Sequence, residues 1–344
     1  DRERTRRINI GVDANLLNNR LGVRFNYFRS ATDHLLMWQE MSYLSGLDKT
    51  WGNGGKLENR GFDVEATGVV WASPSWQWQV GASVGHYKNK VTALPDGQRY
   101  MDTEILGATV RTEIGRPANL FYGYKAQGVF STSAEAQAAG LYIHDDNGVD
   151  RTAFEAGDMH FADLDGDHFI TEADRMVIGD PNPDIYGNIF TSVQYRRLRL
   201  DVRFNYSLGN DIYNYTRQQL ESGSRFMNQT TALARRWQME GQQTDIPRLS
   251  FQDPMGNSRF SDRWIEDGSY LRLKTVTLSY DLPVSSTFLQ GLQFWVQANN
   301  VVTLTRYLGS DPEGTALSAV LGQGIDAGSL PQSRNFMVGI KINL

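Results

Sequence analysis

One segment of the chain carries acidic side chains at the spacing of a calcium-binding loop. With the first aspartate as position 1, acidic oxygens recur at positions 3, 5 and 12, and a backbone carbonyl is available at position 7. The residues are Asp163, Asp165, Asp167, Phe169 and Asp174. Ca²⁺ takes about six to eight oxygen ligands, and this spacing lets one chain wrap around the ion. We therefore predict a structural Ca²⁺ site that braces the surrounding loop.

The loop also departs from the usual calcium pattern. His168 occupies position 6, where glycine normally eases the sharp turn, so we expect this histidine to adopt the left-handed conformation. The layout resembles a dockerin or EF-type loop closed by Asp, where a full EF-hand has Glu. The alternative is an Asp- and Gly-rich turn cluster that holds no metal.

Catalytic chemistry is not expected anywhere in the chain. Asp145 and Asp146, with Asp150, could form a glycosidase-type carboxylate pair, but acids clustered on a loop are usually only solvated. The histidines of this region have no spacing that would hold a catalytic zinc ion. We predict that the chain is not an enzyme.

The composition excludes several classes of protein. The 344 residues include no Cys, and 34 Lys and Arg stand against 39 Asp and Glu, which gives a net charge of -5. The absence of Cys excludes a disulfide scaffold and a thiolate metal site. The acidic balance argues against a nucleic-acid partner. No apolar stretch approaches the ~20 residues of a membrane-spanning helix.

Alternation of apolar and polar residues with period two recurs along nearly the whole chain. It is clearest from Leu198 to Leu208, where Arg199, Asp201 and Arg203 stand between apolar residues. About nine such segments predict β-strands. They are 8–16, 21–27, 62–70, 78–84, 185–195, 198–208, 271–282, 292–302 and 336–344. The parity of 271–282 changes midway, which predicts either a β-bulge near Lys274-Thr275 or a change from a loop-side extension to the lipid-facing wall.

Short and long connections between these segments alternate strictly. The short turns are 17–20, 72–75, 196–197 and 284–290, and the long polar connections are 31–56, 93–183, 210–262 and 304–333. Outer-membrane barrels sort their loops in this way, and closed barrels satisfy every backbone group in lipid. A soluble antiparallel sheet with a solvated polar face is the alternative. Two helices are expected in the long connections, one at 133–140 capped by Ser133 and ended by Gly140, and one at 231–243.

The two faces of the predicted strands suit two different media. The charged face of 198–208 fits a water-filled lumen, since unpaired charges in a dry core cost too much, and the apolar face fits hydrocarbon. Trp71, Trp76 and Trp78 flank one short turn, where an interfacial aromatic belt would place them. The last strand alternates to Leu344, although most outer-membrane barrels end in Phe. The fold class is therefore all-β, a transmembrane antiparallel β-barrel, and open edges imply that further strands lie upstream or in another chain.

Several segments, in order, resemble the C-terminal part of the barrel of the SusC/RagA family of TonB-linked outer-membrane transporters. They are 9–13 with 18–21, 59–65, 121–125, 162–167 with 178–183, 266–274, and 298–300 with 307–313. The resemblance covers essentially the whole chain, 1–344. It implies that these are the last nine strands of a barrel of about 22. The family's plug domain and TonB box are absent from these segments.

The resemblance also implies a function and a set of partners. The assembled protein would import oligosaccharides or peptides across the outer membrane of a Gram-negative, Bacteroidota-like cell. TonB would supply the energy, a SusD-like surface lipoprotein would cap the barrel, and 93–183 would be an extracellular loop. A passive porin, which shares the wall but needs no plug, and a soluble secreted glycan-binding β-protein remain the alternatives.

Overall fold

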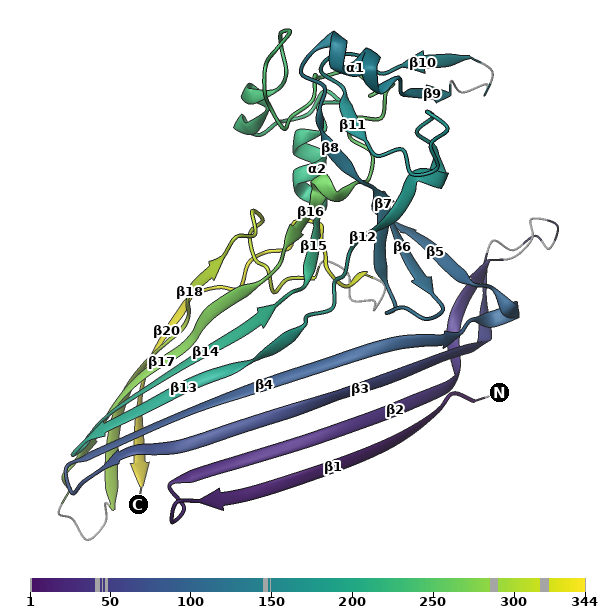
Figure 1. The fold of residues 1–344 in the computed structure, drawn as a ribbon. Coiled ribbons are helices and arrows are strands. Elements are labelled where there is room, and N and C mark those ends of the chain that lie inside the picture. Colours follow the sequence, from purple (N-terminus) through teal and green to yellow (C-terminus); the bar gives the residue numbers. More distant parts are fainter. Residues whose placement is uncertain are drawn as a thin grey trace.

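The computed structural model describes residues 2–40, 44, 46, 49–144, 148, 150–284, 290–315 and 322–343, and only the backbone of 38–40, 49 and 96. Its dominant element is a nine-stranded antiparallel sheet (Figure 1). The strands are β1 (Arg4–Leu16), β2 (Leu21–Glu40), β3 (Lys49–Ala72), β4 (Trp76–Ala93), β13 (Ile185–Tyr195), β14 (Leu198–Leu208), β17 (Tyr270–Leu282), β18 (Gly291–Thr305) and β20 (Asn335–Asn343). Their spatial order follows the chain order, so the sheet has the up-and-down topology that the alternation of short and long connections indicates.

The long connections carry the remaining elements. Between β4 and β13 lie η2 (Pro95–Gly97), β5 (Tyr100–Ile105), β6 (Ala108–Glu113), β7 (Leu120–Tyr124), β8 (Ala126–Val129), α1 (Ser133–Ala139), β9 (Tyr142–His144), β10 (Arg151–Ala153), β11 (Met159–Phe161), η3 (Glu172–Asp174) and β12 (Arg175–Gly179). Later come β15 (Asp211–Asn214), α2 (Tyr215–Glu221), η4 (Thr231–Arg235), η5 (Asp262–Trp264), β16 (Ile265–Asp267) and β19 (Ile325–Asp326). These insertions gather at one end of the sheet, and the turns at 17–20, 73–75 and 196–197 lie at the other (Figure 1). No helix in the described part of the chain is long and apolar enough to cross a membrane.

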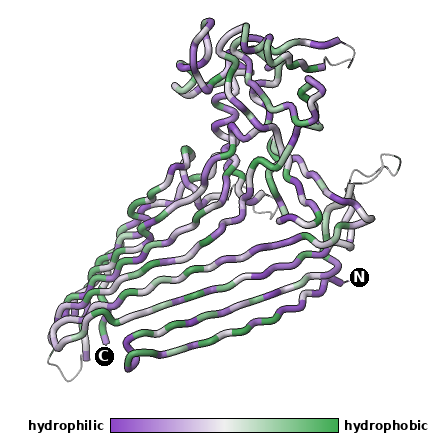
Figure 2. Tube along the Cα trace, viewed as in Figure 1, coloured by the Kyte–Doolittle hydropathy of each residue, from purple (hydrophilic) through white to green (hydrophobic). Residues whose placement is uncertain are grey.

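Both hydrophobic core clusters lie mainly in the insertions rather than in the wall of the nine-stranded sheet. One comprises Phe130, Ala136, Leu141, Phe154, Met159, Phe161, Ile170 and Met255, and the other comprises Ala108, Val110, Phe121, Tyr213, Phe260, Trp264 and Ile325. By contrast, Phe336 and Val338 of β20 are 78% and 79% exposed. Figure 2 shows the alternating hydropathy along the wall strands. The apolar rows of the wall are thus not covered by the described residues of the chain.

The expected long loop at 31–56 is wrong in its extent. β2 continues to Glu40 and β3 begins at Lys49, with irregular register at Asp33/Leu35 and Leu35/Leu36. Backbone pairing continues there although the apolar alternation has stopped, because ladder hydrogen bonds do not require apolar side chains. The predicted bulge is confirmed by a register shift between Leu273 and Thr275.

The helix predictions are corrected in detail. The helix near 133 forms and ends at Gly140, whose φ is 62°, but its N-cap is Thr132 rather than Ser133. The Thr132 side chain accepts a hydrogen bond from the backbone N–H of Glu135, and the Glu135 carboxylate accepts one from Ser131. The expected helix at 231–243 is only a short 3₁₀ turn at Thr231–Arg235, since the chain turns back at Trp237 to pair with Ile246.

Candidate functional site

A continuous polar face runs across the sheet. Asp13, Arg24 and Glu65 stand opposite one another on β1, β2 and β3, and Arg24 Nε lies 2.9 Å from the Asp13 carboxylate. Arg199 and Asp201 form a further ion pair at 3.0 Å on β14. On the last strands the charges give way to hydrogen-bonded amide and hydroxyl side chains, namely Thr277, Gln297, Asn299 and Asn335. This face suits contact with water.

The opposite face is apolar and ends in aromatic residues at the short turns. Trp71 and Trp78 stand opposite each other on β3 and β4, and the rings of Trp76 and Tyr195 lie 4.6 Å apart. All four side chains are exposed. This is the position of an aromatic girdle at a membrane interface.

The acidic loop folds around three of its predicted carboxylates. Ligand oxygens of Asp163, Asp165 and Asp174 all lie within 4.8 Å of one another, although Asp174 is eleven positions from Asp163 in sequence and fully buried. The structure does not bring Asp167 into this group, and its carboxylate instead accepts the backbone N–H of Phe169 at 2.7 Å. His168 adopts the predicted left-handed conformation, with φ 67°.

The same carboxylates also hold the loop through backbone hydrogen bonds. The two Asp174 oxygens accept the N–H groups of Leu164 and Thr171 at 2.8 and 2.7 Å. The Asp163 oxygens accept those of Gly166 and His168. Each oxygen keeps a second lone pair, so these bonds are compatible with a metal ion. They would equally support the metal-free turn cluster.

The electrostatics of the loop show crowding of negative charge. The pKa of Asp165 is raised: the backbone N–H of Asp167 lowers it, but desolvation and the carboxylates of Asp167, Asp174 and Asp163 outweigh that effect. The pKa of Asp163 is lowered, because its backbone hydrogen bonds outweigh the opposing effect of desolvation. A cation among the three oxygens would relieve the repulsion.

Two of the sequence segments that carried the family resemblance meet in space. Arg272 of β17 forms ion pairs with Asp311 and Glu313, the latter at 2.7 Å. The Glu266 carboxylate accepts the backbone N–H of Leu308 at 2.9 Å. These residues join the wall to its insertions, so their role is structural.

A cavity of mixed charge, which the sequence did not indicate, lies among the insertions. Its volume is about 430 Å³, and its charged lining residues are Arg217, Glu221, Arg235, Asp245, Asp262 and Arg263. Burial, and then the nearby Arg217 cation, lower the pKa of Arg263 to about 10. Arg263 Nη2 has no hydrogen-bond partner among the described residues. No residue spacing could have found this site, because its charges come from separate loops.

Asp145 and Asp146 lie outside the described residues, and so do Leu344 and most of the turn at 284–290.

Comparison with known proteins agrees with this geometry. No family model matches the chain. Over 99% of its length it is 30% identical to TonB-dependent receptor P3 and 26% identical to TonB-dependent receptor P26, both of Formosa agariphila. The RagAB peptide importer in its closed-closed state matches 99% of the chain with a TM-score of 0.77 at 25% identity. The RagAB peptide transporter matches it with a TM-score of 0.78 at 24% identity.

The chain is SusC/RagA-like. Its fold is that of part of a TonB-dependent receptor barrel, which confirms the predicted fold class. The SusC/RagA-like chain spans about a third of these proteins, since the matches cover 34% of each Formosa receptor and 35% of the RagAB chains. These similarities support an outer-membrane location. The total strand number and the closure of the barrel stay predictions.

Proposed function

We propose that this chain is the C-terminal portion of the barrel of an outer-membrane importer of oligosaccharides or peptides. The observation that carries the proposal is the two-faced sheet, which is apolar and uncovered on one side and charged on the other, with every insertion at one end. Lipid on the apolar side and water on the polar side stabilise such a wall. The family resemblance supplies the remaining parts: other barrel strands, a plug, TonB as the energy source and a SusD-like lipoprotein cap.

Peptides are the cargo that the mixed-charge cavity favours. Three arginines and three acids line it, and one nitrogen of Arg263 has no partner in the part of the chain that the structure describes. A zwitterionic peptide offers a carboxylate and an ammonium group to such a lining, whereas a neutral oligosaccharide offers neither. The name of the RagAB peptide importer agrees with this choice. The chain itself is proposed to perform no chemical reaction.

We further propose that Ca²⁺ binds at Asp163, Asp165 and Asp174 in a structural role. Ile170 lies between Asp165 and Asp174 in the sequence and belongs to a buried core cluster of the insertions. An ion there would fix the loop before the chain re-enters the wall at β13.

Uptake by cells tests the import proposal. Cells that lack the full-length protein are complemented with it and supplied with labelled peptides or labelled oligosaccharides. We expect complementation to restore peptide uptake and a protonophore to abolish it. Uptake that persists with the protonophore would support a passive porin. Recovery of the folded chain from the soluble fraction without detergent would support the soluble alternative, and restored uptake of oligosaccharides alone would overturn the cargo assignment.

A further inference from the structure

On the apolar face of the wall, apolar side chains give way to charged side chains near the insertions. On β3, side chains of one face run from Val64 and Phe62 to Arg60 and Glu58, and on β4 from Val84 and His86 to Lys88 and Lys90. No register shift interrupts the pairing of these segments. The basic residues are therefore on the same face as the apolar rows and lie directly beyond them, on the side of the insertions.

We name this group the basic collar. It comprises Arg4 and Arg6 of β1, Arg29 of β2, Arg60 of β3, and Lys88 and Lys90 of β4. The pairing of the strands aligns three of its members, because Arg29 stands directly opposite Arg60 and Arg60 directly opposite Lys88. Lys90 stands opposite Glu58, and Arg4 stands opposite Asp33. Like charges directly opposite each other on neighbouring strands destabilise a sheet. An anion between them would remove this cost.

The chain's own acids neutralise little of this charge. Glu58 pairs with Arg29 at 3.1 Å, and Asp33 is engaged by Lys56 at 3.2 Å. Within the described ranges no hydrogen bond or ion pair is formed by the exposed side chains of Arg60, Lys88 and Lys90. The collar therefore keeps several free cations at one level of the wall.

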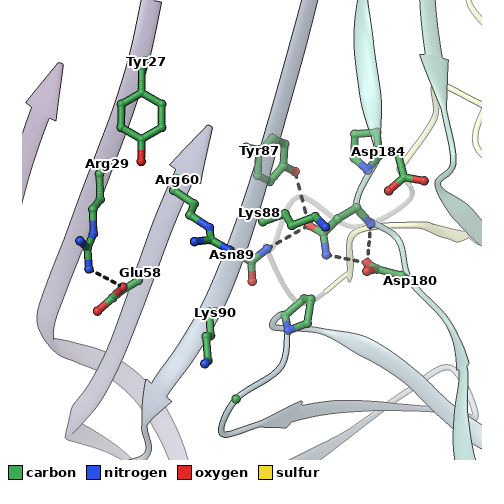
Figure 3. Close-up of a pocket in the computed structure, with 14 residues that line it drawn as sticks. Tyr27, Arg29, Glu58, Arg60, Tyr87, Lys88, Asn89, Lys90, Asp180 and Asp184 are labelled. Carbon is green, nitrogen blue, oxygen red and sulfur yellow. Dashed lines mark hydrogen bonds and ion pairs between the residues drawn. The ribbon is translucent and has the colours of Figure 1, made fainter. Parts of the chain in front are cut away.

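A cavity of about 600 Å³ opens beside the collar (Figure 3). Tyr27, Arg29, Glu58, Arg60, Lys88 and Lys90 line it from the wall. Asp180 and Asp184 line it from the segment before β13, and Asp180 is occupied by hydrogen bonds from Asn182. Tyr87 and Asn89 also donate to Asn182, which holds this segment against β4. The cavity is thus preformed, and its cationic side is the wall.

The height of the collar matches a lipid headgroup layer. From Phe62 to Trp71 the apolar part of β3 is roughly 30 Å long at ~3.3 Å per residue. Tilted by ~40°, it rises about 23 Å, close to the ~25 Å apolar band of outer-membrane barrels. With Trp71 at one interface, Arg60 lies just beyond the other.

We propose that the basic collar binds the phosphate groups of outer-leaflet lipid headgroups. Arginine can bind phosphate oxygens in pairs and lysine attracts them as a point charge, so the collar fits a phosphorylated headgroup whose acyl chains lie along the apolar rows below. Free inorganic phosphate would have no reason to select this face or this height. The proposal rests on the proposed membrane function.

Lipid binding by the full-length protein in detergent tests the collar. The combined variant Arg60→Gln, Lys88→Gln and Lys90→Gln is compared with Arg199→Gln and Arg203→Gln, which remove positive charge from the opposite face. Micelles contain lipid A or enzymatically dephosphorylated lipid A, and native mass spectrometry counts bound lipid. We expect the collar variant to retain lipid A at least about tenfold more weakly, as the attraction of three cations near a membrane surface implies. We expect the control to retain it like the wild type, and the dephosphorylated lipid to bind weakly to all.

Three outcomes would overturn the proposal that the basic collar binds lipid phosphate. They are equal retention by the collar variant and the control, equal binding of dephosphorylated lipid, and complete displacement by millimolar inorganic phosphate, which would show a simple anion site. Heat-modifiable migration on gels confirms that each variant is folded. A wild-type protein that embeds in membranes but binds lipid A equally well with and without its phosphates would refute the lipid-phosphate proposal alone. A wild-type protein that stays soluble without detergent would refute the proposed membrane function.

Discussion

Val202 and Arg203 are neighbours on β14, but their side chains point to opposite faces of the wall. We expect Val202→Arg to destabilise the membrane-inserted barrel by about 2–4 kcal/mol, because it places a charge in hydrocarbon near the bilayer centre. Arg203→Ala should be structurally tolerated, since water contacts its face. Urea titration of the folded barrel in lipid vesicles measures both. Equal effects of the two substitutions would contradict the facing.

The acidic loop is the second test at the residue scale. Removing Ca²⁺ with a chelator should accelerate hydrogen exchange of the amides at 163–174, because the crowded carboxylates then repel one another. Asp165→Asn should already exchange fast and should not respond to the chelator. Glu172→Gln is the matched control, since Glu172 is exposed and pairs with Arg175 outside the carboxylate trio. A chelator-insensitive wild type would favour the metal-free turn cluster.

At the scale of an element, α1 depends on its cap. Thr132→Ala removes the side-chain acceptor of the Glu135 N–H at the helix start and should cost about 1 kcal/mol of local stability. Thr132→Ser keeps the hydroxyl and should behave as the wild type. Hydrogen exchange of the amides at 133–139 is the measurement. If the alanine variant exchanged no faster, the packing of Ala136 in the core would be what holds the helix.

At the scale of the whole molecule, we predict that the insertions face the outside of the cell. An epitope tag placed beside Phe226, which is 93% exposed within an insertion, should be reached by antibody on intact cells. A tag in the turn at 73–75 should be reached only after the outer membrane is permeabilised, since that turn lies at the opposite end of the sheet. Labelling of both tags on intact cells would contradict the sorting of the loops.

The sequence alone determined the wall. Period-two alternation states which side chains share a face, so the nine segments, the two media and the bulge near Lys274 followed from local patterns. It also placed the acidic loop, because the carboxylates of that loop come from one short stretch of the chain. The length of β2 and β3 was not foreseen, since backbone ladders continue where apolar alternation has ended.

Only the tertiary structure decided which distant residues meet. The mixed-charge cavity joins Arg217, Asp245 and Arg263 from separate turns of an insertion, and no periodicity records their proximity. The basic collar depends on register, which places Arg29, Arg60 and Lys88 in one row. Register and the docking of loops arise from many weak long-range contacts. The alternation of apolar and polar residues along a strand, by contrast, depends only on residues that are adjacent in the sequence.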